Sequence, residues 1–196
     1  GTFSDIAAFS THPLKNLNGL GDGGFVTTNN KILYEKIKLY RNHGMKSRDN
    51  VHLFGVNSRL DVLNAEVLNF RLSKLDEVIS KRQKNVSLYR EMITAKEVKI
   101  PIENTYQTNS YVMCIAQCER RDDLKKFLEK NGIETLVYYG TPLHLHKASN
   151  KFGYKNGDFP NAEKLCKLVL ALPHHQFLSS DDISFVSKKI NEFYGA

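Results

Sequence analysis

The sequence lacks tryptophan and contains only three cysteines and five prolines among its 196 residues. The cysteines, Cys114, Cys118 and Cys166, form no CxxC pair. This sparse set predicts reduced thiols in a cytoplasmic protein rather than a disulfide framework. A zinc site at Cys114 and Cys118 is an alternative, but both lie in an apolar, strand-like run, which favours packing roles. We therefore expect no metal site.

Long hydrophobic runs are also absent, which argues against a membrane-spanning helix. The start shows no charged segment followed by an apolar stretch, so we expect no secretory signal. Hydrophobic residues make up 41% and charged residues 25%, a balance typical of globular proteins. Lys and Arg (28) outnumber Asp and Glu (21), and the resulting net charge of +7 favours anionic partners such as nucleic acid or a phosphorylated small molecule.

Charge is scarce in one stretch of the chain: between Ile6 and Gly21, Lys15 is the only fully charged side chain. A glycine cluster follows it, and glycines permit tight turns and close approach of the backbone to a ligand. A lysine held away from water loses proton affinity and becomes a nucleophilic amine. The setting therefore suggests a Schiff-base lysine, with an ordinary loop lysine as the alternative.

The pattern of the first half predicts two short strands followed by helices. Small apolar and β-branched runs at residues 7–10 and 24–28 read as strands. Asn29 or Asn30 can cap a helix over residues 31–43. Residues 60–92 hold neither proline nor glycine, which predicts a long helical segment, kinked or divided in two, with Asn57 or Ser58 as its cap.

Pro101 separates a second half with a different pattern, in which strands and helices alternate. This order predicts a small α/β layer. The expected elements are strands at 110–116 and 133–139, a loop at 141–160, and helices at 120–132, 162–172 and 180–193, the last capped by Ser179 or Ser180.

Seven segments in order resemble one enzyme family. The segment FSTHPLKNLNGLGDGG resembles the cofactor-lysine segment of the pyridoxal-phosphate-dependent nucleotide-sugar aminotransferases of the DegT/DnrJ/StrS type, in which a serine, H-P-x-K and a G-D-G-G turn follow one another. The other matching segments are RNHG (41–44), GVNSRLDVLNAEVL (55–68), GIET (132–135), PLHLH (142–146), GDFPNAEKL (157–165) and ALPHH (171–175).

The resemblance implies a role for individual residues around pyridoxal phosphate. Lys15 would form the Schiff base and carry the proton during transamination, and Ser10 would bind the cofactor phosphate. Asn57 would reach the phosphate of the neighbouring subunit in a homodimer. His12 would line the cofactor pocket, with a packed imidazole as the alternative. His144 and Tyr138 lie where the family shapes the substrate site.

The resemblance also implies the fold class and the reaction. The chain would be α/β: residues 1–95 part of a fold-type-I large domain with a long connecting helix, and residues 96–196 a small C-terminal domain. The reaction would move an amino group, from glutamate, to a keto group of a nucleotide-linked deoxysugar, with neither nucleic acid nor membrane as partner. At Tyr138, Tyr139 and Asn109 the sequence departs from the residues that are frequent in the family. The identity of the sugar substrate therefore stays open.

The position of Lys15 near the start of the chain adds a further expectation. In the family the cofactor lysine lies near the middle, so the chain resembles a C-terminal half without the residues that hold the pyridine ring, and we expect it to be inactive alone. Two rival interpretations stay open at this point. One is a basic binding module for nucleic acid or an acidic partner, which the net charge supports. The other is a non-catalytic remnant that dimerises.

Overall fold

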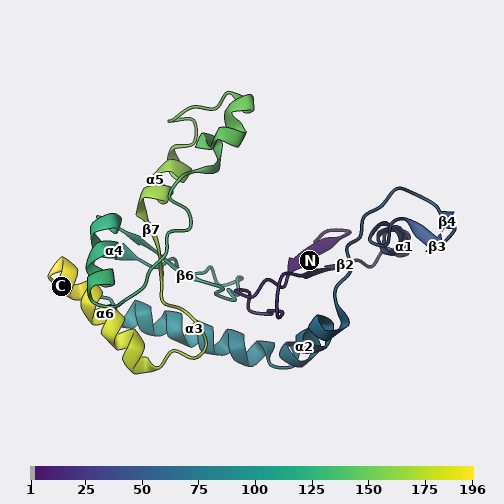
Figure 1. The fold of residues 1–196 in the computed structure, drawn as a ribbon. Coiled ribbons are helices and arrows are strands. Elements are labelled where there is room, and N and C mark those ends of the chain that lie inside the picture. Colours follow the sequence, from purple (N-terminus) through teal and green to yellow (C-terminus); the bar gives the residue numbers. More distant parts are fainter. Residues whose placement is uncertain (1–2) are drawn as a thin grey trace. The chain divides into compact units, whose positions relative to one another are not determined.

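A computed structural model describes residues 3–196, and its contacts divide the chain into two units, Gly1–Asp76 and Glu77–Ala196. The division falls near the start of helix α3 (Leu75–Met92), which is labelled in Figure 1. The domain boundary expected at residues 95/96 lies after the end of this helix and stays a prediction.

The first unit begins with a two-stranded antiparallel sheet, formed by β1 (Ala7–Ser10) and β2 (Gly24–Thr27). The strands pair with Ser10 opposite Gly24, so the loop between them starts and ends at the same end of the hairpin. Both expected strands are confirmed. The loop they frame, residues 11–23, carries Lys15.

The helix after this sheet, α1 (Lys31–Tyr40), starts where the sequence predicts. The side chain of Asn30 accepts hydrogen bonds from two backbone N–H groups of the first turn, which have no partner within the helix. The helix ends earlier than expected, and Gly44 follows it with φ +71. A second antiparallel hairpin, β3 (Met45–Ser47) and β4 (Asn50–Val51), comes next.

The stretch without glycine or proline forms two helices, α2 (Val62–Leu72) and α3, so the expected interruption is confirmed. Its expected cap is wrong, because Asp61 and neither Asn57 nor Ser58 occupies the N-cap position. The backbone at Asp61 is extended, and Asn57, four residues earlier, makes an isolated antiparallel bridge to Asn42.

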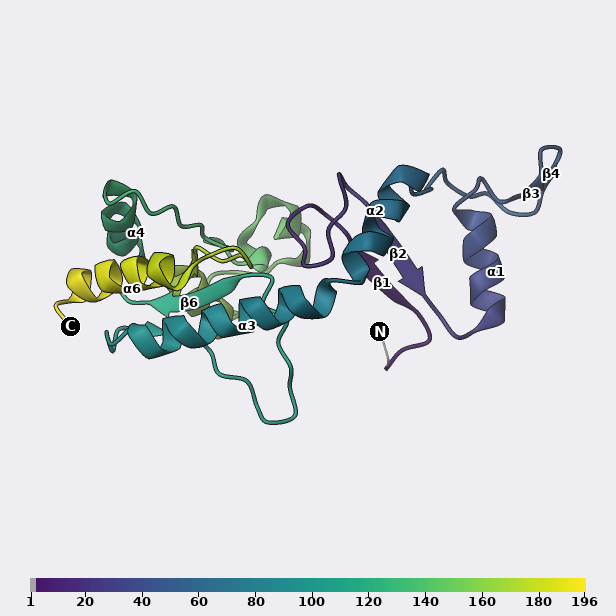
Figure 2. The same cartoon turned by 90° about the horizontal axis from the view of Figure 1, so that it is seen from below.

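The second unit is built on a three-stranded antiparallel sheet in the order β5 (Val98–Lys99), β6 (Cys114–Cys118), β7 (Val169–Leu172). One face of the sheet packs against α3, α4 (Arg121–Lys130) and α6 (Ser180–Tyr194), which Figure 2 shows gathered around β6. The fully buried side chains of this core include Val86, Tyr89, Ala116, Cys118, Leu124, Leu128, Leu170, Ile183 and Ile190.

Two expectations for this unit are wrong. Residues 133–139 form no strand; within them Leu136 makes a single bridge to Ala171. The helix expected over residues 162–172 ends at Leu168, because α5 (Pro160–Leu168) passes directly into strand β7. The apolar run pairs with β6, a partner more than fifty residues away in sequence, and this pairing overrides its local helical pattern.

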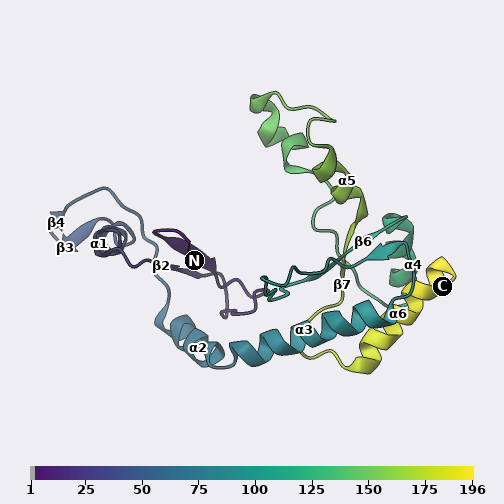
Figure 3. The ribbon, with the colours of Figure 1, turned by 180° about the vertical axis from the view of Figure 1, so that it is seen from behind.

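The strand expected at residues 110–116 starts four residues later, as β6, whereas α4 and α6 lie where the sequence predicts helices. Ser179 caps α6 in a capping box with Asp182, in which each side chain accepts from the other's backbone N–H. The expected loop at residues 141–160 contains two short 3-10 helices, η1 (Leu143–Leu145) and η2 (Lys147–Phe152). Figure 3 shows them with α5, away from α4 and α6. No described helix is both long and apolar enough to cross a membrane.

Candidate cofactor-lysine site

Lys15 lies in the tight turn that follows β1. Its backbone N–H donates to the carbonyl oxygen of His12 at 2.8 Å, and the residue is half-buried. Pro13 stands between the two and fixes the backbone at the entry of the turn. The lysine therefore projects from a short segment of defined geometry.

The two ends of the loop are tied together at Thr11, which is fully buried. Its N–H donates to the carbonyl of Gly23 at 2.9 Å, and its carbonyl accepts from the N–H of Gly19 at 2.8 Å. A Cβ at Gly23 would lie 2.9 Å from both the Thr11 hydroxyl and the side chain of Leu60. Glycine is needed there because no side chain fits into this contact.

Helix α2 holds the far side of the loop through two polar side chains. Asn64 Oδ1 accepts from the backbone N–H of Leu20 at 2.9 Å. Arg71 Nη1 donates to the carbonyl oxygens of Asn18 at 2.6 Å and Gly19 at 3.3 Å. Sequence reasoning missed both residues. Their spacing of seven, two helical turns on one face, was the signal that could have found them.

Ser10 and His12 lie just before the lysine, on the same short segment. The Ser10 hydroxyl accepts from the backbone N–H of His12 at 3.3 Å. The ring of His12 accepts from the N–H of Leu14 through Nδ1 at 3.1 Å, and its Nε2 lies 3.7 Å from Asp22 Oδ1. An acceptor at Nδ1 leaves the proton of the neutral ring on Nε2, toward the carboxylate. A hydroxyl, an imidazole and the amine of Lys15 thus occupy six consecutive residues.

Asn57 lies elsewhere in the first unit. It is exposed, and its backbone pairs with Asn42, whose side chain accepts from Arg59 at 2.7 Å. Among the contacts described for residues 3–196, none joins Asn57 to the Lys15 loop. Its assignment to a neighbouring subunit's cofactor phosphate stays a prediction.

The expected substrate residue His144 forms an ion pair or hydrogen bond with Glu163, with Nε2 and Oε1 3.0 Å apart and both side chains largely buried. Its ring also packs on Phe159, with centroids 4.7 Å apart. Burial opposes the charge on Glu163, but bonds from the Gly157 N–H, His144 and the Phe159 N–H outweigh it and lower the pKa of the carboxyl. The imidazole therefore anchors the start of α5, and its role toward substrate stays a prediction.

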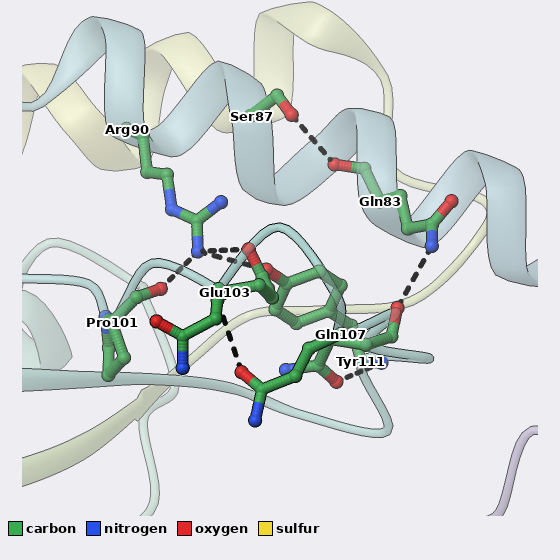
Figure 4. Close-up of polar contacts among 9 residues, drawn as sticks. Gln83, Ser87, Arg90, Pro101, Glu103, Gln107 and Tyr111 are labelled. Carbon is green, nitrogen blue, oxygen red and sulfur yellow. Dashed lines mark hydrogen bonds and ion pairs between the residues drawn. The ribbon is translucent and has the colours of Figure 1, made fainter.

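Tyr138 and Asn109, which depart from the family pattern, lie in segments that are held by different contacts. Tyr138 is half-buried, with its ring against Tyr139 at 5.3 Å. The segment around Asn109 is fastened to α3, because the Asn109 carbonyl accepts at 3.0 Å from the side chain of Gln83, which is labelled in Figure 4. In the same view Arg90 donates to the hydroxyl of Tyr111 at 2.9 Å. The substrate role of Tyr138 stays a prediction.

Two of the cysteines have the packing role that the sequence favours. Cys114 and Cys118 lie on the core face of β6, and burial raises the pKa of each thiol to about 12. Within residues 3–196, no group of three or more His, Cys, Asp or Glu side chains is arranged to hold a metal ion.

A family model extends the evidence across the chain. Residues 1–191 match the DegT/DnrJ/EryC1/StrS aminotransferase family. The chain belongs to this family. The resemblance and the fold class predicted from the sequence are thereby confirmed, and aminotransferases of this family use pyridoxal phosphate.

Individual proteins and a solved structure are similar to the chain over nearly its whole length. The chain is 36% identical to the "pleiotropic regulatory protein" of Geobacillus stearothermophilus over 99% of its own length and 53% of the relative. It is 34% identical to a dTDP-3-amino-3,4,6-trideoxy-alpha-D-glucose transaminase of Streptomyces venezuelae, over 88% and 46%. The crystal structure of S. venezuelae DesV with a ketimine intermediate matches at a TM-score of 0.93 and 32% identity, over 97% and 52%. The chain thus spans about half the length of these relatives.

Proposed function

We propose that this chain supplies the cofactor lysine of an aminotransferase that moves an amino group from glutamate to a keto group of a nucleotide-linked deoxysugar. The observation that carries the proposal is Lys15, half-buried in a glycine-rich loop of the aminotransferase family. The sugar-nucleotide part rests on the similarity to relatives such as the dTDP-sugar transaminase of Streptomyces venezuelae.

The residues of the Lys15 loop fit pyridoxal phosphate. When bound, this cofactor supplies an aldehyde that condenses with an amine and a ring that withdraws electrons from the carbon beside that amine. Lys15 offers the amine and later takes and returns the proton at Nζ. The exposed hydroxyl of Ser10 is free to donate to a phosphate oxygen while it accepts from the amide of His12. The glycines keep side chains out of the loop.

Other parts of the proposal concern assembly and location. We expect a cytoplasmic homodimer in which Asn57, exposed in the first unit, reaches the cofactor phosphate of the neighbouring subunit. His144 and Tyr138 would line the path of the sugar. Each assignment comes from the family resemblance.

The surface of the first unit supports the expectation that residues 1–196 are inactive by themselves. Leu68 is its one buried large apolar side chain within the described residues, whereas Phe9 and Phe25 of the two-stranded sheet are each 40% exposed. A two-stranded sheet alone is marginally stable, so this sheet needs a cover. A polypeptide of the relatives' full length would supply both the cover and the groups that hold the cofactor ring.

Reduction with borohydride tests the proposal directly. A full-length polypeptide containing these residues is mixed with pyridoxal phosphate, its absorbance is recorded, and the cofactor is fixed to the protein by borohydride. Peptide mapping should place the label on Lys15, and Lys15→Arg should abolish it. The matched variant Lys31→Arg, on the exposed start of α1, should keep the label.

Two results would each contradict a different part of these expectations. The first is a label on a lysine other than Lys15. The second is transamination of a keto-sugar by residues 1–196 alone, which would overturn the expected need for further chain.

A further inference from the structure

The contact between α2 and the Lys15 loop points to a role for two side chains beyond the cofactor lysine itself. We propose that Asn64 and Arg71 are positioning residues that fix the direction of Lys15. This inference rests on the proposed function, because it assumes that Lys15 is the reacting amine. Neither residue is suggested to touch cofactor or substrate.

The hydrogen bonds of α2 fall on the part of the loop just after the lysine. Arg71 binds two successive carbonyl oxygens, those of Asn18 and Gly19, with one guanidinium nitrogen. Bonds from a charged donor are the stronger kind, and these are partly buried. Asn64 binds the next amide, that of Leu20. Two consecutive peptide units, Asn18–Gly19 and Gly19–Leu20, are thus tied to one rigid helix.

A second set of hydrogen bonds connects this restrained part of the loop to the turn that carries the lysine. The side-chain amide of Asn18 donates to the carbonyl of Pro13 at 2.9 Å, and the N–H of Lys15 donates to the carbonyl of His12 at 2.8 Å. The lysine therefore lies inside a turn that is braced at both ends. Loss of the helix contacts frees the C-terminal end of the turn, and a displacement near 1 Å is enough to slow a positioned reaction by about 100-fold.

The contact is also sterically close. A Cβ at Gly19 would lie 2.4 Å from Asn64 Oδ1, and the next two nearest atoms also belong to the Asn64 side chain. Gly19 therefore lets the loop approach α2 closely at Asn64. This pairing gives the inference a test that does not depend on activity.

The main experiment compares variants of the full-length polypeptide after mixing with pyridoxal phosphate. The measured quantity is the rate at which the cofactor becomes fixed to Lys15 by borohydride, together with kcat and KM for the sugar nucleotide. We expect Asn64→Leu, which keeps the shape but removes the acceptor, to lower the trapping rate and kcat by about 10-fold or more, with KM little changed. Asn64→Asp keeps the acceptor and should restore both.

A matched control separates positioning from general stability. Asn69→Leu makes the same chemical change at an exposed site on α2. Asn69→Leu should trap the cofactor at the wild-type rate. Its melting temperature should equal that of Asn64→Leu. A trapping rate for Asn64→Leu equal to wild type overturns the inference. The inference is also overturned if the melting temperature of Asn64→Leu falls together with its trapping rate and Asn64→Asp does not restore the melting temperature, because this result indicates a structural role.

A double-mutant cycle keeps the inference testable even where Asn64→Leu folds poorly. Gly19→Ala alone should slow trapping because the new methyl group collides with Asn64. In the Asn64→Ala background the collision partner is gone, so Gly19→Ala should add little further loss. Additive losses would overturn the inference. Absence of any label on Lys15 in the wild type would instead reject the proposed function.

Discussion

The partly buried imidazole of His174 makes the stability of the second unit depend on pH. Its Nε2 lies 3.0 Å from the carbonyl oxygen of Tyr111, so this nitrogen carries the proton of the neutral ring. Nδ1 is buried without a hydrogen-bond partner in the described structure. A second proton, on Nδ1, would therefore be buried without an acceptor.

The surroundings of His174 lower its pKa to about 4, first through burial and then through the charges of Arg82 and His175. Arg82 is fixed nearby, since it donates to the carbonyl of Tyr111 at 3.1 Å. The folded pKa lies below the ordinary value of 6.5, so the unfolded chain binds the proton more readily between these values. Stability is complete above about pH 6.5 and falls as the pH decreases toward 4.

The size of the effect follows from the shift. From pH 6.5 to pH 5 the full linkage is about 2 kcal/mol, at 1.36 kcal/mol per unit. The ring is only partly buried, so solvent screening reduces this to about 1 kcal/mol. The lowered pKa values of Glu163 and Asp182 act below their ordinary values of 4.5 and 3.8, outside this window.

Urea unfolding at a series of pH values between about 7 and 5 measures this loss. His174→Gln retains an N–H for the carbonyl of Tyr111 but does not titrate, so it should flatten the pH dependence. His146→Gln, at an exposed site, should retain the wild-type slope. Equal slopes for wild type and His174→Gln would show that the imidazole already accepts its proton in the folded state.

Two further predictions concern other parts of the chain. Gly44→Ala should destabilise the first unit by about 2 kcal/mol or more, measured by urea unfolding, because φ is +71 and the Cβ would lie 1.7 Å from the carbonyl oxygen of Leu53; an unchanged midpoint would mean that this corner is not formed. In mass-resolved labelling with a thiol reagent, the half-buried Cys166 should react well before Cys114 and Cys118, whose pKa values burial raises to about 12; labelling at equal rates would contradict the packed core.

Much of the fold follows from short-range sequence signals. The cap at Asn30, the capping box at Ser179 and the division between α2 and α3 were all predictable, because each depends on residues within one or two helical turns. The inward positions of α6, Ile183, Val186 and Ile190, were predictable for the same reason and are buried.

The elements that sequence analysis placed wrongly depend on distant partners. The run at residues 169–172 continues a helical pattern but becomes β7, since β6 offers it a ladder of hydrogen bonds. Residues 133–139 have the composition of a strand, yet they gain a single bridge, at Leu136. Composition says what a segment can form, and the presence of a neighbouring strand decides whether it does.

For the candidate site, the sequence by itself determined the chemistry: an isolated lysine, a serine five residues before it and a glycine cluster after it all lie on one short stretch, where chain connectivity alone keeps them near one another. The tertiary structure decided what holds that stretch in place. Asn64 and Arg71 reach the loop from more than forty residues away, and His144 meets Glu163 from another helix. Such contacts arise only when the chain folds back on itself, because a side chain's partner is set by packing rather than by its neighbours in sequence.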